Sequence, residues 1–108
     1  MKKLFISQPM SGKTNEEILA VREKAIASAK RQCGEDIEVI DSFIKDAPYQ
    51  ANPLWYLSQS LAKLSEADIA YFAKGWETAR GCKIEMMCAI QYGIKTIFEG
   101  LYGITTIT

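Results

Sequence analysis

The sequence predicts an α/β three-layer sandwich, in which helices cover both faces of one parallel sheet. Short apolar runs alternate with longer segments of helical periodicity, and turn residues bound them. A helix between each pair of strands is the pattern of βαβ crossovers, which make strands parallel. The length of 108 residues and the hydrophobic content of 48% suit one ordinary core. We therefore expect a single domain over residues 1–108.

The first strand and helix follow from residues near the N-terminus. Residues 2–7 form a short apolar run behind two lysines, typical of a strand buried on both faces. Thr14 and Glu17 have the spacing of a capping box, so a helix should begin near Asn15. Apolar residues recur along it at helical spacing, and Gly34 is the expected stop.

The second strand and helix are separated by a long loop. Residues 37–40 predict the strand. Asn52 followed by Pro53 is typical of an N-cap and a proline at the first helical position. This helix should end near Ser65. Leucines at helical spacing predict its buried stripe, namely Leu54, Leu57, Leu61 and Leu64.

The second half of the chain repeats the alternation. The apolar run at residues 68–73 predicts a buried third strand. Residues 82–92 predict a third helix, with Gly93 at its C′ position. Residues 94–98 predict a fourth strand. We expect the Thr- and Ile-rich tail, residues 99–108, either to add an edge strand or to reach a neighbouring subunit.

This element order predicts a flavodoxin-like sheet with strand order 2-1-3-4. Ligands of such sheets bind beyond the carboxyl ends of the strands, at the point where the strand order reverses. That point lies between the first and third strands. The loops that follow these strands are residues 7–13 and 74–85. Topology alone therefore predicts a ligand site between these two loops.

Composition excludes several classes of function. Lys+Arg and Asp+Glu balance at 13 each, so no net charge attracts nucleic acid or an anionic membrane. No apolar run approaches the roughly 20 residues of a membrane span. Three cysteines without framework spacing, and no signal peptide, predict a cytoplasmic protein. The absence of histidine excludes His-based nucleophile pairs and metal sites, and we expect neither a metal nor a cofactor.

Glu85 is the main candidate for chemistry. It should lie one turn inside the third helix, whose N-terminus binds anions through unpaired N–H groups. A carboxylate there can act as a nucleophile or base, or can merely complement the helix dipole. Its helical neighbours Cys82, Ala89 and Tyr92 are small or aromatic, which is unusual for a solvated face. Arg80 is open to three interpretations: a surface cation, a partner for Glu85, or a phosphate ligand.

Three further features have competing interpretations. The Ser-Gly-Lys-Thr of residues 11–14 suggests a P-loop, but that motif requires a glycine where Ser7 stands. We therefore disfavour an NTPase and keep Lys13 as an anion ligand. Cys82 is more simply a packing residue than a reactive thiol, because it has no partner nearby. Trp76 is either an aromatic wall for a base or sugar, or a plug that closes its loop.

Four stretches resemble the small DUF4406 family, which belongs with the nucleoside 2-deoxyribosyltransferase-like proteins. They are FISQPMSG at 5–12, NPLWYL at 52–57, ADIAYF at 67–72 and GWETARGCKIE at 75–85. The resemblance covers essentially the whole chain. In the enzymes of this group, a glycine-rich loop leads into a helix that carries a glutamate nucleophile. Gly81, Glu85, Ala89 and Gly93 fit that pattern.

The resemblance implies a role for each part of the site. Glu85 would attack the anomeric carbon of a nucleoside or nucleotide, displace the base and hold a glycosyl ester. Transfer to another base or to water would follow. The resemblance also implies a homo-oligomer with sites at subunit interfaces. The substrate-binding candidates are Ser7, Gln8, Met10, Gly12, Lys13, Asp41, Trp76, Arg80 and Gly81.

The chain departs from the enzymes at two positions. Ser60 stands where they carry an aspartate that assists departure of the base, and Ala79 stands where they carry a polar or acidic residue. Loss of such an acid removes about 10²–10⁴-fold in rate. Asp41, or an acid of a neighbouring subunit, would have to substitute.

Two alternatives to an enzyme follow from these departures. The first is a non-catalytic module that binds a nucleotide through the same anion site. The second is a purely structural oligomer. In a structural oligomer, Glu85 should pair with Arg80 or face solvent, and residues 7–13 should be packed shut.

Overall fold

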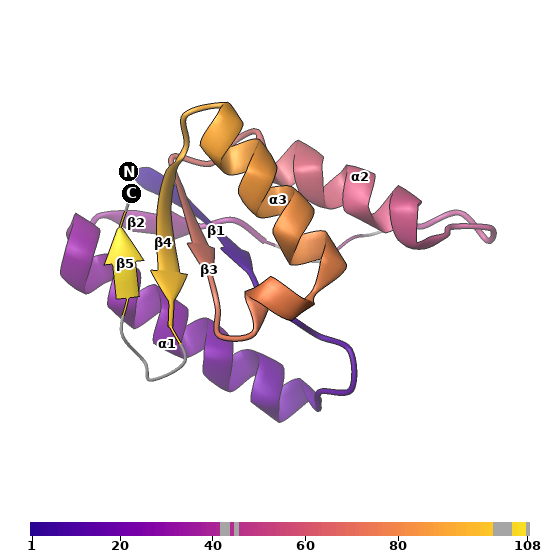
Figure 1. Ribbon diagram of the computed structural model, residues 1–108, viewed down its shortest axis with the longest axis horizontal. Coiled ribbons are helices and arrows are strands. Elements are labelled where there is room, and N and C mark those ends of the chain that lie inside the picture. Colours follow the sequence, from indigo (N-terminus) through magenta and orange to yellow (C-terminus); the bar gives the residue numbers. More distant parts are fainter. Residues whose placement is uncertain (42–43, 45, 101–104, 108) are drawn as a thin grey trace.

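The computed structural model describes residues 1–41, 44, 46–100 and 105–107. Figure 1 shows α1 on one side of a sheet, and α2 and α3 on the other. The elements are β1 (Lys2–Ser7), α1 (Asn15–Cys33), β2 (Ile37–Val39), α2 (Pro53–Leu64), β3 (Ile69–Phe72), a 3₁₀ turn η1 (Trp76–Thr78), α3 (Arg80–Gln91), β4 (Lys95–Glu99) and β5 (Thr105–Ile107).

The sheet has the predicted parallel order β2-β1-β3-β4. β1 pairs with both β2 and β3, and β3 pairs with β4. β5 lies antiparallel beside β4. Of the tail considered from the sequence, residues 101–104 and 108 lie outside the described residues. The four parallel strands and three helices confirm the α/β architecture and are consistent with a flavodoxin-like winding.

The sheet separates two hydrophobic clusters. Successive side chains of a strand point to opposite faces, so Tyr71 and Phe72 of β3 are both fully buried but belong to different clusters. The cluster under α1 is built on Leu4, Ile6, Ala25, Ala29, Ile37, Ile69, Tyr71, Ala73 and Ile97. The cluster under α2 and α3 is built on Phe5, Leu64, Ala70, Phe72 and Ala89. Burial on both faces explains why these strands are continuously apolar.

Capping residues set the ends of α1 and α2 as predicted. Thr14 and Glu17 exchange two hydrogen bonds of 3.1 Å each, which is a complete capping box. Asn52 Oδ1 accepts the N–H of Trp55 at 2.8 Å. α3 differs, because it begins at Arg80, two residues before the predicted start. Its N-cap residue Ala79 makes no side-chain hydrogen bond, so no capping residue marks this boundary in the sequence.

Two expectations about α2 and β4 need correction. Leu54 was predicted to be buried, but it is 70% exposed, whereas Leu64 is buried. Leu54 lies in the first turn of α2 and belongs to neither hydrophobic cluster. The fourth strand runs from Lys95 to Glu99, one residue later than predicted. The shift includes Glu99, whose side chain is buried.

Candidate functional site

A cavity of about 830 Å³ lies at the carboxyl end of β1, between that strand, α2 and the start of α3. This volume is typical of small-molecule sites. Most lining side chains are apolar, and the charged ones among the described residues are Arg80 and Glu85. The lining residues are Phe5, Ile6, Ser7, Gln8, Pro9, Met10, Ile44, Asn52, Pro53, Leu54, Tyr56, Leu57, Ser60, Ala79, Arg80, Gly81, Cys82, Ile84 and Glu85.

Glu85 lies on the buried side of α3 and lines this cavity. Its side chain is only 7% exposed. The hydroxyl of Ser7, the last residue of β1, donates a hydrogen bond of 2.7 Å to Glu85 Oε1. Burial raises the pKa of the Glu85 carboxyl, and hydrogen bonds from Ser7 and Ser60 partly oppose that rise. Glu85 takes part in neither ion pair found among the described residues.

Ser60 and Cys82 complete the surroundings of this carboxyl. Ser60 comes from α2 and lines the cavity, and its hydroxyl acts to lower the pKa of the Glu85 carboxyl. Cys82 lies one turn before Glu85 in α3 and is buried. Burial raises the pKa of the Cys82 thiol, and the charge of Glu85 raises it further, against a lowering by Ser7. A raised pKa leaves little thiolate at neutral pH, which supports the packing role for Cys82.

Arg80 and the first turn of α3 form the cationic part of the cavity. Arg80 and Gly81 both line it, and the Arg80 side chain is exposed. The first N–H groups of a helix have no partner within the helix, and Ala79 offers no capping side chain. Arg80 forms no ion pair with Glu85 in the part of the chain described. A guanidinium beside a helix N-terminus is suited to bind an anion.

The loop after β1 contributes its first half to the cavity. Residues 7–10 line it, whereas Gly12 and Lys13 do not. Gln8 is buried, and its Nε2 donates to the carbonyl of Ile18 at 3.1 Å, which ties the loop to α1. Because residues 7–10 line the cavity, the loop is not packed shut as a structural oligomer would require.

Trp76 and Asp41 are not among the residues that line the cavity. The Trp76 ring lies 6.1 Å from the Phe72 ring and 5.1 Å from the Phe98 ring, centroid to centroid. It packs against the cluster under α2 and α3, which agrees with a plug and not with an aromatic wall. Asp41 is exposed just after β2. The lining therefore gives no support to Asp41 as the substitute for the missing acid, and that role stays a prediction.

Part of the lining was not selected from the sequence. Residues 44, 52–54 and 56–57 reach the cavity from the long loop and the start of α2, and Ile84 reaches it from α3. The strand-order rule identifies loops at strand ends but does not say which helix will wall the site. No sequence pattern marked this wall, because the exposure of Leu54 and Tyr56 beside the buried Leu64 is visible only in the structure.

Comparison with known proteins gives one match. A protein-family model described as Domain of unknown function (DUF4406) matches residues 2–98, from β1 into β4. No curated protein and no solved structure matches the chain. Within the described ranges, no helix has the length and hydropathy to cross a membrane. The same ranges contain no group of three or more Cys, Asp or Glu side chains arranged to hold a metal ion.

Proposed function

We propose that this chain, which belongs to the DUF4406 family, binds a nucleoside or nucleotide and cleaves its N-glycosidic bond with Glu85 as nucleophile. One observation carries the proposal. Glu85 is a buried carboxylate that lines a cavity of small-molecule size and is held by hydroxyl groups, not by a cation. A structural carboxylate of equal burial would ordinarily be paired with a cation. An unneutralised carboxylate at a cavity is characteristic of a functional group.

The reaction begins with attack of the Glu85 carboxylate on the anomeric carbon. The carbon–nitrogen bond breaks, its electron pair leaves with the base, and the base takes up a proton. A glycosyl ester remains on Glu85. A nitrogen of a second base, or water, then attacks the same carbon and releases the carboxylate. The Ser7 hydrogen bond orients the attacking group, which lowers the entropic part of the barrier.

The phosphate of a nucleotide substrate would bind at the start of α3. Arg80 supplies the cation and the first turn supplies backbone donors, both at the cavity. The apolar lining, which includes Phe5 and Leu57, would face the base. This arrangement favours a nucleoside monophosphate over a substrate with several phosphates, because the described lining contains one cationic side chain.

The departing base needs a proton donor, and the described lining residues include no second carboxylate. Ser60 is directed to Glu85 and is not an acid. The enzymatic proposal therefore includes a homo-oligomer, in which a neighbouring subunit supplies the donor. Its expected location is the cytoplasm. The same observation favours a second candidate, a module that binds a nucleotide without cleaving it. In that module Glu85 would hydrogen-bond to the ligand and would not attack it.

Mass spectrometry of the intact protein tests the enzymatic proposal. The protein is incubated with mixed deoxynucleosides and deoxynucleoside monophosphates, beside Glu85→Gln and Glu77→Gln. Glu77 is exposed in η1, so its variant controls for loss of one carboxylate. We expect a mass increase of one deoxyribosyl unit, or its phosphate, in the wild type and in Glu77→Gln but not in Glu85→Gln. An adduct that persists in Glu85→Gln would refute the nucleophile.

Calorimetric titration with the same ligands separates the two candidates. A binding module should bind a monophosphate without releasing free base, and Arg80→Ala should weaken that binding. Glu85→Gln should leave the affinity nearly unchanged, because the amide keeps a donor and an acceptor. Absence of both adduct and binding would reject both candidates.

A further inference from the structure

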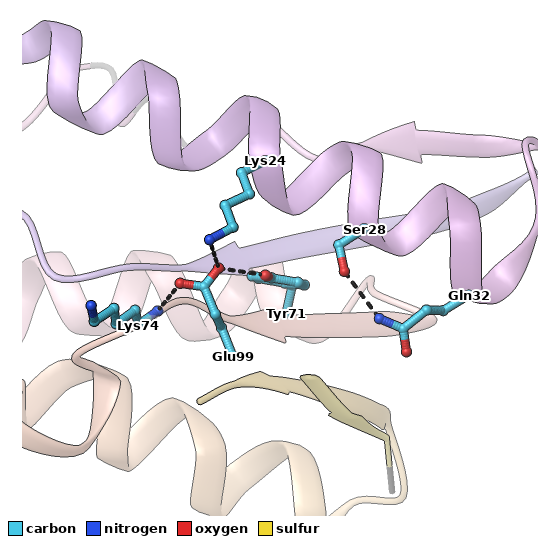
Figure 2. A network of polar contacts seen from close by, with 6 residues as sticks. All are labelled: Lys24, Ser28, Gln32, Tyr71, Lys74 and Glu99. Carbon is cyan, nitrogen blue, oxygen red and sulfur yellow. Dashed lines mark hydrogen bonds and ion pairs between the residues drawn. The ribbon is translucent and has the colours of Figure 1, made fainter. Parts of the chain in front are cut away.

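A second buried glutamate, Glu99, ends β4 on the α1 side of the sheet (Figure 2). Its Oε1 accepts the hydroxyl of Tyr71 at 2.8 Å and lies 3.5 Å from Lys24 Nζ. Its Oε2 accepts the backbone N–H of Lys74 at 3.1 Å. Burial and the bond to Glu99 raise the pKa of the Tyr71 hydroxyl, so that it remains a donor. Both carboxylate oxygens therefore have partners, and the side chain is 5% exposed.

Lys74 is where the chain leaves the sheet for the cavity. The segment from residue 74 to 79, here called the β3–α3 loop, contains η1 and ends at the N-cap of α3. Gly75 adopts φ +92°, a left-handed conformation that favours glycine. Because this short loop leads directly into α3, a shift at Lys74 would move the start of the helix. Arg80 is its first residue, and Glu85 follows more than one turn later.

Among the described residues, the β3–α3 loop is bonded to the end of β3 by the Trp76 N–H and the Ala73 carbonyl at 3.0 Å, and Gly75, Trp76 and Lys74 contact more distant segments. A Cβ at Gly75 would lie 3.4 Å from the side chain of Pro9, so this loop is packed against the loop after β1. Trp76 packs on aromatic rings of β3 and β4. The third contact is the Glu99–Lys74 hydrogen bond. A bond from an N–H to an ionised carboxylate is about twice as strong as a neutral one and fixes direction as well as distance.

We infer that Glu99 is a positioning residue for the Glu85 cavity, which it reaches through the backbone of Lys74. Glu99 and the cavity lie on opposite faces of the sheet, so the effect is transmitted by the loop and not by contact. The effect on catalysis rests on the proposed function, whereas the effect on loop and helix position does not.

Amide hydrogen exchange and thiol labelling test the inference. Glu99→Met fills the space without an acceptor, and Lys24→Met removes only the ion pair. We expect exchange of the Lys74 amide to quicken at least about tenfold in Glu99→Met. Cys82, at the start of α3, should react faster with a thiol reagent in the same variant, in a background where Cys33 and Cys88 are serine. Lys24→Met should change neither rate.

Conservative and shortened variants provide the remaining controls. Glu99→Gln keeps an acceptor for Lys74 and should restore both rates to near the wild-type values. Glu99→Asp retains the charge but withdraws the carboxylate from Lys74, and it replaces Glu99→Met if that variant does not fold. Unchanged exchange at Lys74, or faster exchange with unchanged labelling of Cys82, would overturn the inference.

Adduct formation provides an independent measurement. If the wild type forms the Glu85 adduct, its rate of formation should fall in Glu99→Met and recover in Glu99→Gln. If the wild type forms none, the enzymatic proposal fails, and the Lys74 and Cys82 measurements still decide the role of Glu99.

Discussion

Glu85 and Glu99 are both buried near the carboxyl edge of one sheet, but their surroundings differ. Glu99 accepts from Tyr71 and from the N–H of Lys74, and it faces the ammonium of Lys24. Among the described residues, the Glu85 side chain has hydroxyl partners and no ion pair, and it lies at a cavity, where burial raises the pKa of its carboxyl. The Glu99 carboxylate is compensated by these donors and by the Lys24 cation, and it joins elements of the fold. The Glu85 carboxylate has no such cation among the described residues, which costs stability and is typical of functional sites.

The largest expected effect on stability comes from Glu99→Ala. The substitution leaves the Tyr71 hydroxyl and the Lys74 N–H without this acceptor, and a buried unpaired group costs about 1–3 kcal/mol. Lys24 contributes little, because its side chain is 58% exposed and returns to water. We expect a loss of roughly 2–4 kcal/mol, measured by urea unfolding. A loss no larger than that of an exposed control, Glu38→Ala, would contradict the structural role of Glu99.

Glu85→Gln should raise the free energy of unfolding, the opposite of the effect expected for Glu99→Ala. Removal of an uncompensated buried charge should stabilise the protein by about 0.5–2 kcal/mol at pH 7, as at other functional sites where stability and function conflict. The same urea unfolding experiment measures it. Glu77→Gln, at an exposed position, is the matched control and should change little. A marked destabilisation by Glu85→Gln would place both glutamates in the same structural class.

The pH dependence of this difference sharpens the comparison. Because the pKa of Glu85 is raised on folding, the folded protein binds the proton more tightly than the unfolded chain. Stability from this group is then complete below the ordinary glutamate pKa of about 4.3 and falls as pH rises through the raised pKa. The gain from Glu85→Gln should therefore vanish at acid pH and grow toward neutrality. Urea unfolding curves of the wild type and Glu85→Gln from pH 4 to pH 8 measure this gain. A gain that shrinks toward neutrality would contradict the raised pKa.

The smallest effect on stability is expected for Arg80→Ala. The side chain is exposed and forms no ion pair among the described residues, so the change should stay within about 0.5 kcal/mol. Monophosphate affinity should nevertheless fall, because Arg80 is the cationic side chain among the described residues that line the cavity. Calorimetry with a nucleoside and with its monophosphate separates the contribution of Arg80 to phosphate binding from any contribution to binding of the sugar or base. Equal loss of affinity for both ligands would assign Arg80 to the sugar or base.

Local patterns predicted much of the fold because they act over short distances. The capping box at Thr14 and the Asn52 N-cap marked two helix starts within a residue. The start of α3 was missed because Ala79 caps it without a side-chain bond. Glu99 was assigned to a tail because a single acid after an apolar run gives no sign of burial. Its burial depends on Tyr71, which lies 28 residues earlier.

The sequence by itself determined the order of elements, the parallel sheet and the edge at which Glu85 would lie, since periodicity and handedness govern these features. The tertiary structure decided which partners each side chain meets. It joined Ser7 to Glu85 across 78 residues, left Arg80 apart from that carboxylate, and turned Trp76 to the core. Side-chain direction at the end of a strand or helix depends on the packing of distant segments, and no local pattern encodes that packing.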